Sequence, residues 1–150
     1  MGGLFHLRPY RAGDEAAAIE LWQRTWQQAY PEIDFAARVA WWRQRWRDEL
    51  VPAARITVAE DDGGALIGFV TIDASGYLDQ LVADRSHWGS GLALQLVNRA
   101  KQLSPAGISL LVNADNSRAI RFYEKAGFLH GGDDVNPISG RKVRRMTWTP

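Results

Sequence analysis

The chain has 150 residues, of which 46% are hydrophobic and 23% charged, a composition typical of one folded domain spanning 1–150. Its 18 basic and 17 acidic residues give a net charge of +1, which offers no electrostatic argument for nucleic acid or an anionic membrane as a partner. The chain has no cysteine, which excludes disulfides, thiolate metal sites and a cysteine nucleophile.

The N-terminal third of the chain predicts one strand followed by two helices. Residues 4–8 alternate weakly between apolar and polar side chains, as a strand does. Asp14 is placed to cap a helix that runs to about Tyr30 and carries an apolar stripe. Asp34 is placed to cap a second helix, which reaches about Leu50 and has its arginines on the outer face.

The middle of the chain predicts three consecutive antiparallel strands, over residues 55–60, 65–72 and 77–83. The first two strands are separated by Asp-Asp-Gly-Gly at 61–64, which is a strong hairpin signal. Gly68 lies inside the second strand, and a glycine there indicates a bulge or the close approach of another segment.

The C-terminal part of the chain predicts helices alternating with strands. A helix is expected over 89–103, a buried central strand over 108–113, and a second helix that ends at Gly127. A strand from Phe128 and a strand over 142–148 follow, and the last one is expected to close the sheet. The crossover through the first of these helices makes the third meander strand and the buried strand parallel neighbours.

A glycine-rich turn, Trp-Gly-Ser-Gly-Leu-Ala at 88–93, joins the third meander strand to the next helix. Such a turn exposes backbone N–H groups at a helix N-terminus, where the helix dipole is positive. The turn therefore favours an anion, most often a phosphate, although turns of this kind also occur in unrelated proteins.

Two motifs together carry a more specific signal than the turn alone. The turn at 88–93 resembles the pyrophosphate signature Gln/Arg-x-x-Gly-x-Gly/Ala of the GNAT superfamily of acyl-CoA-dependent N-acyltransferases, with Trp88 in place of the usual first residue. The segment 116–128 matches the family's second signature, Asn-x-x-Ala-x-x-Phe-Tyr-Glu-Lys-x-Gly-Phe, throughout. The resemblance implies an α/β (α+β) fold with a mixed, mostly antiparallel central sheet of about seven strands, flanked by four helices, in which the fourth and fifth strands splay apart.

The resemblance also implies acetyl-CoA as the co-substrate. Its pyrophosphate would lie on the backbone N–H groups of 89–93, with Trp88 or His87 packed beside it. The pantetheine arm would pair with 81–83 like an added strand, and the Asn116 amide would contact it, although a plain helix N-cap explains Asn116 equally well. The full set of expected cofactor-binding residues is Leu81, Val82, Ala83, His87, Trp88, Gly89, Ser90, Gly91, Leu92, Ala93, Asn116, Ala119 and Phe122.

The mechanism that the resemblance implies is direct attack of a neutral amine on the thioester. A backbone N–H near Val82 would stabilise the oxyanion, and Tyr123 would protonate the departing thiolate, unless Tyr123 only packs on its helix. Asp79 is the candidate base because it shares a strand face with Leu81, but a substrate-binding or structural carboxylate fits Asp79 equally well. His87 is the second candidate for the base.

The expected acceptor is a primary amine of a small molecule or peptide. Aromatic residues of the first two helices and the segment between them are the candidates for its pocket: Trp26, Tyr30, Phe35 and Trp41. A catalytically silent acyl-CoA-binding sensor is the alternative function.

No metal is expected, because the three histidines do not have ligand spacing. No nucleic-acid or membrane partner is expected either. The absence of a secretory leader and of any apolar run near 20 residues favours a cytoplasmic location. The chain is expected to be a monomer, or a homodimer paired through its last strand.

Overall fold

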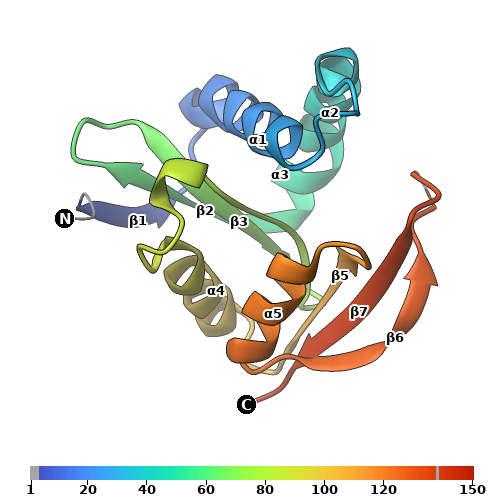
Figure 1. The fold of residues 1–150 in the computed structure, drawn as a ribbon. Helices are drawn as coiled ribbons and strands as arrows, with labels where there is room; N and C mark the ends of the chain where they lie inside the picture. Colours follow the sequence, from blue (N-terminus) through green and yellow to red (C-terminus); the bar gives the residue numbers. More distant parts are fainter. Residues whose placement is uncertain (1–3, 138) are drawn as a thin grey trace.

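The computed structural model describes residues 4–137 and 139–150, which form one sheet of seven strands with helices on both faces (Figure 1). The strands are β1 (Phe5–Pro9), β2 (Ala54–Asp61), β3 (Leu66–Asp73), β4 (Tyr77–Ala83), β5 (Ile108–Asn113), β6 (Leu129–Val135) and β7 (Lys142–Trp148). The helices are α1 (Glu15–Ala29), α2 (Val39–Arg45), α3 (Val51–Ala53), α4 (Leu92–Leu103) and α5 (Ser117–Lys125). The predicted fold class and the predicted order of strands and main helices are confirmed.

The strand order in the sheet is β1-β2-β3-β4-β5-β7-β6, with β4 and β5 parallel. The prediction that the last strand closes the sheet is wrong, because β7 lies between β5 and β6 and is antiparallel to both. The physical reason is burial. Val143 and Met146 of β7 are buried, whereas every residue of β6 is exposed, so the more apolar strand takes the interior position.

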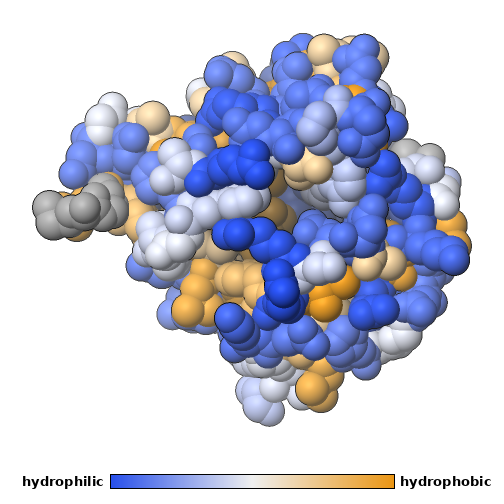
Figure 2. Space-filling model, viewed as in Figure 1, coloured by the Kyte–Doolittle hydropathy of each residue, from blue (hydrophilic) through white to orange (hydrophobic). Residues whose placement is uncertain are grey.

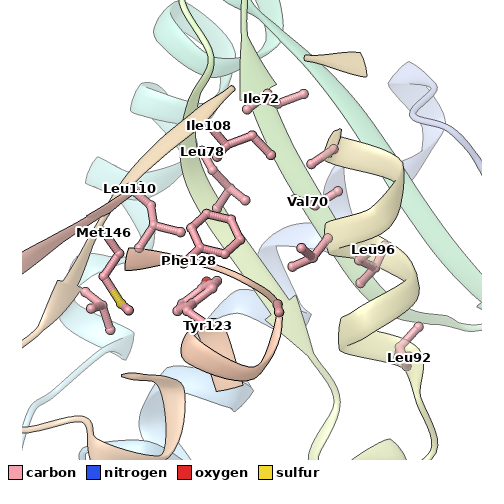
Figure 3. Packing of buried hydrophobic residues seen from close by; sticks show 14 of the residues in the cluster. Val70, Ile72, Leu78, Leu92, Leu96, Ile108, Leu110, Tyr123, Phe128 and Met146 are labelled. Carbon is pink, nitrogen blue, oxygen red and sulfur yellow. The ribbon is translucent and has the colours of Figure 1, made fainter. Parts of the chain in front are cut away.

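Each face of the sheet carries its own hydrophobic core. On the α4 and α5 face, side chains of β3, β4, β5 and β7 pack against both helices (Figure 3). On the α1 and α2 face the core is aromatic, and the rings of Trp22 and Trp42 stack with centroids 4.6 Å apart. Trp22, Trp42 and Trp46 are all buried in this core.

The second predicted helix is built from several pieces. A 3-10 turn, 36–38, leads into α2, and a π-helical turn (Trp46–Leu50) follows. The short helix α3 then continues three residues past Leu50, where the helix was expected to end. Pro52 is tolerated because it lies in the first turn of α3, where a backbone N–H is not needed. The Oδ1 of Asp34 accepts a hydrogen bond from the Ala37 N–H at 3.2 Å, which agrees with its predicted capping role.

The cap at Asp14, the start of α4 and the close approach at Gly68 can each be compared with what the sequence predicted. Asp14 precedes α1 but gives it no side-chain cap, because the Arg8 guanidinium and the Arg11 N–H bind its carboxylate. The helix α4 begins at Leu92, three residues later than predicted, since a left-handed glycine precedes it. The close approach predicted at Gly68 is confirmed, because a Cβ there would lie 3.0 Å from a side-chain atom of α4.

Candidate active site

The site begins with an opening in the sheet between β4 and β5. The two parallel strands are paired only at Tyr77 with Ser109 and at Leu78 with Leu110. From Asp79 onward β4 has a strand partner on its β3 side alone. The predicted splaying of these strands is therefore present, and it leaves one edge of β4 free for an extended ligand.

The backbone of β4 alternates in direction along this free edge. The Asp84 N–H donates to the Ile67 carbonyl at 2.8 Å, so the backbone groups of Asp84 point to β3. Two residues earlier, Val82 points the same way, opposite Phe69. Strand alternation therefore turns the groups of Leu81 and Ala83, and not those of Val82 itself, toward the opening, so an oxyanion N–H near Val82 would belong to one of these two neighbours.

A β-bulge in β4 lies where the two strands separate. The register passes from Thr71 opposite Gln80 to Ile72 opposite Leu78, so Asp79 is the extra residue. The Gln80 N–H donates to the hydroxyl of the fully buried Thr71 at 3.0 Å, which satisfies a backbone group that the bulge removes from the ladder. The bulge re-aims the Asp79 side chain relative to a regular strand.

The glycine turn after β4 presents free donors beside this edge. Gly89 and Gly91 have φ values of 85° and 87°, and a Cβ on either would meet no heavy atom within 4 Å. Within the described residues, no hydrogen bond uses the N–H groups of Gly89, Gly91 or Ala93. The other two N–H groups of the turn have partners, because Ser90 donates to the His87 carbonyl at 3.1 Å and Leu92 donates to the Ser90 hydroxyl at 3.4 Å. The turn therefore fits a pyrophosphate held by backbone donors at the start of α4.

Trp88 lies against the end of β4. Its Nε1 donates to the Ala83 carbonyl at 3.1 Å, so the indole occupies one acceptor of the free edge. Arg118 and Arg85 both lie over its ring. His87 lies beyond the C-terminal end of β4, whereas Asp79 lies near the N-terminal end. The Nδ1 of His87 is 3.1 Å from the Ser86 hydroxyl. That placement sets His87 beside the turn and away from the bulge.

The helix α5 supplies the residues of the second motif. Asn116 Oδ1 accepts from the Ala119 N–H at 3.2 Å, so Asn116 is an N-cap whose side-chain NH₂ stays available to a ligand. Tyr123 is 7% exposed, and its ring packs edge-on against Phe128 (Figure 3). The Phe122 ring packs edge-on against it as well. Burial raises the pKa of Tyr123, so its hydroxyl keeps its proton at neutral pH.

The Asp79 carboxylate is bound by the guanidinium of Arg45, a contact that the sequence did not predict. Arg45 donates from Nη1 to Oδ1 at 3.0 Å and from Nη2 to Oδ2 at 2.5 Å, and Gln80 Nε2 donates to Oδ1 at 2.9 Å. The expectation that the arginines of this helix all face outward is wrong for Arg45. Its position three residues after the buried Trp42 places it near the buried stripe, which is the signal that could have found it.

The Asp79 carboxylate lines a cavity of about 180 Å³ between the sheet and the α2 side. Its polar lining includes three carboxylates and one guanidinium, from Glu49, Asp73, Asp79 and Arg45. Burial and the nearby Asp79 charge raise the pKa of Tyr77, another lining residue. The excess of negative charge suits a cationic ligand.

Three of the four aromatic residues expected in the acceptor pocket form one cluster, because the ring of Trp26 contacts those of Tyr30 and Phe35. Phe35 is only 4% exposed and also packs edge-on against Trp22, so it is part of the aromatic core as well. Trp26 stacks on Tyr30. Trp41 is 45% exposed and lies on the surface.

Tyr30 has a polar role that its place in the sequence did not show. Its hydroxyl accepts from Asn113 Nδ2 at 2.9 Å and donates to Asp115 Oδ1 at 3.1 Å. Tyr30 thereby ties the α1–α2 connection to the end of β5. Burial raises the pKa of Tyr30, with the Asp115 carboxylate acting in the same direction and the Asn113 hydrogen bond against it.

These features surround a hollow on the face shown in Figure 2, below α1 and above α4 and α5, where strongly hydrophilic side chains border the opening. Among the described residues, no cluster of His, Asp or Glu could hold a metal ion. In the same part of the chain, no helix is long and apolar enough to cross a bilayer.

Comparison with known proteins agrees with this geometry. The profile of the acetyltransferase (GNAT) family matches residues 16–128. The peptidyl-lysine N-acetyltransferase YjaB of Salmonella typhimurium is 27% identical over 136 residues, which are 90% of this chain and 91% of that protein. The spermidine N(1)-acetyltransferase of Vibrio cholerae is 34% identical over 108 residues, 63% of this chain and 62% of that protein. The solution structure of YjaB from Escherichia coli superposes with a TM-score of 0.78 at 22% identity over 97% of both chains.

The family match covers most of the chain, including β4, the glycine turn and α5. The chain therefore belongs to the GNAT family of acetyltransferases and is an acetyl-CoA-dependent N-acetyltransferase.

Proposed function

We propose that the acceptor is a cationic primary amine, on a polyamine-like molecule or a lysine side chain, and that it enters through the cavity that holds Asp79. The observation that carries this proposal is the cavity lining, in which Glu49, Asp73 and Asp79 outnumber the one guanidinium of Arg45. A positively charged substrate gains from that field, whereas a neutral aromatic amine does not. The relatives named for peptidyl-lysine and spermidine acetylation support the same acceptor class.

The co-substrate has a defined direction in this proposal. Its pyrophosphate binds at the glycine turn, and the pantetheine arm runs back along the free edge of β4 past Ala83 and Leu81. Asn116 contacts the arm from the other side of the opening, with Ala119 and Phe122 on the same helix turn. The thioester then reaches the bulge, where the acceptor cavity begins.

The transfer itself is direct. The neutral amine attacks the thioester carbonyl, and the Leu81 N–H, which points into the opening, stabilises the oxyanion. When the C–S bond breaks, the Tyr123 hydroxyl donates its proton to the departing thiolate sulfur. Burial raises the pKa of Tyr123, which keeps the hydroxyl protonated until the thiolate forms.

Asp79 orients the amine, and the amine proton leaves to water. The bidentate contact from Arg45 occupies both carboxylate oxygens and fixes their orientation, which favours the binding alternative over general-base catalysis. His87 lies beside the glycine turn, so we assign it to the cofactor side of the site.

A thiol-release assay with acetyl-CoA tests the acceptor class. We expect release with spermidine and with a lysine-containing peptide, and little with an aromatic amine that is uncharged at neutral pH. Equal rates for the charged and aromatic amines would contradict the electrostatic argument. Coenzyme A binding without thiol release on any amine would instead favour the silent sensor.

A further inference from the structure

Two arginines from separate elements lie over one indole ring at the mouth of the opening. The guanidinium carbon of Arg118 is 4.0 Å from the ring centroid of Trp88, and that of Arg85 is 4.9 Å from it. Arg118 belongs to the first turn of α5, and Arg85 to the short turn after β4. The indole is itself fixed to the Ala83 carbonyl, so the ring brings both cations beside the end of β4.

This arrangement is electrostatically incomplete. Within the part of the chain that the structure describes, neither Arg85 nor Arg118 forms an ion pair with a carboxylate, and the two like charges share one ring. Arg118 also lies in the first turn of a helix, where the helix dipole disfavours a cation. An anion beside Trp88 would offset both costs.

We propose that Arg118 and Arg85 bind the pyrophosphate of coenzyme A, with Trp88 as the platform that orients them. The family signature places Gln or Arg at the position of Trp88, and an indole cannot supply a guanidinium's charge. Here that charge arrives from two neighbouring elements, next to the free N–H groups of Gly89 and Gly91. A guanidinium presents paired donors that match phosphate oxygens, which makes it suited to this role. The proposal deepens the coenzyme A site and is independent of the acceptor class.

Equilibrium binding of coenzyme A by calorimetry tests the assignment without turnover. Arg118→Gln should raise the Kd about tenfold, and the dependence of binding on salt should weaken. Arg121→Gln is the matched control, because Arg121 lies on the same helix without an ion pair among the described residues. An unchanged Kd for Arg118→Gln, or an equal rise for both variants, would overturn the proposal.

Dephospho-coenzyme A separates the two phosphate positions. Since it keeps the pyrophosphate and lacks the 3′-phosphate, Arg118→Gln should weaken its binding by the same factor. A loss seen with coenzyme A alone would overturn the pyrophosphate assignment. Failure of the wild-type protein to bind either ligand would instead reject the coenzyme A site itself.

The Kd for coenzyme A in a double variant tests the role of Trp88 as a platform. In a Trp88→Ala background Arg118 has no ring to hold it, so the further change to Gln should raise the Kd less than threefold. A full tenfold rise in that background would show that Arg118 acts without Trp88 and would overturn the platform role.

Discussion

Arg45 of α2 and Asp79 of β4 meet in a two-point contact, with Nη1–Oδ1 and Nη2–Oδ2 distances of 3.0 and 2.5 Å. The contact joins the acceptor-side helix to the bulge where the sheet opens. Burial alone would lower the pKa of Arg45, but the Asp79 carboxylate raises it, so the guanidinium stays charged. Asp79 is thus held in one orientation toward the cavity.

Asp79→Asn should raise the KM for a cationic amine about tenfold, because one charge–charge contact of roughly 1.4 kcal/mol is lost. The Kd for acetyl-CoA should stay unchanged, and the pH profile of kcat/KM should keep the position of its acidic limb. Steady-state kinetics across pH provide the measurement. Loss of that limb in the variant would make Asp79 the general base and contradict the binding role.

Tyr123→Phe should lower kcat severalfold or more while acetyl-CoA binds with unchanged affinity. The hydroxyl acts only as the thiolate departs, so its loss affects the transition state and not the ground-state complex. Single-turnover kinetics and calorimetry on the same preparation separate the two effects. Phe128→Leu, a change at a ring that packs on Tyr123 outside the cofactor site, is the packing control. A kcat equal to that of the wild type would remove Tyr123 from the mechanism.

The order of elements and the phosphate-binding turn could be read from the sequence because their signals are local. Hydrophobic period, turn glycines and helix caps all act over a few residues, and so they located α4, β5 and the turn at 88–93. The two signature segments then tied the turn to α5, although the 22 residues of 94–115 separate them.

The remaining features depend on contacts that are distant in sequence. The bulge at Asp79 arises from the register of β4 on β3, and no single-strand pattern encodes a register. The order of β6 and β7 follows from which strand buries more apolar surface against α5 and β5. The contact of Arg118 with the Trp88 ring joins residues 30 positions apart. The local sequence indicates it only through an unfavourable cation in the first turn of α5.

Gly91→Ala should weaken coenzyme A binding and destabilise the fold by about 1 kcal/mol, because residue 91 needs a left-handed backbone at the start of α4. Gly64→Ala is the matched control. It carries the same strain at φ 84° in a hairpin turn, also with no heavy atom near its Cβ, but it lies outside the site. Both variants should lose similar stability in urea, and only Gly91→Ala should lose affinity. Equal Kd values would place the pyrophosphate elsewhere.

Asp14 should make the free energy of unfolding depend on pH in the acidic range. Its carboxylate accepts from Arg8 Nη1 and Nη2, each at 2.8 Å, and these bonds, with the Arg11 N–H, lower the pKa of Asp14 below 3.8 despite its burial. A carboxyl group whose pKa is lower in the folded state than in the unfolded state stabilises the fold at every pH above its unfolded-state pKa. This stabilisation is lost as the pH falls through the pKa of the folded state.

Asp14→Asn should therefore cost about 2 kcal/mol of unfolding free energy at pH 7, and the difference from the wild type should shrink as the pH falls below about 3.8. Urea titrations at several pH values measure both quantities. Asp62→Asn is the control, because Asp62 lies in the hairpin turn and forms no ion pair among the described residues. A gap between wild type and Asp14→Asn that stays constant into acid would show that the carboxylate stabilises the fold through its shape and hydrogen bonds and not through its charge.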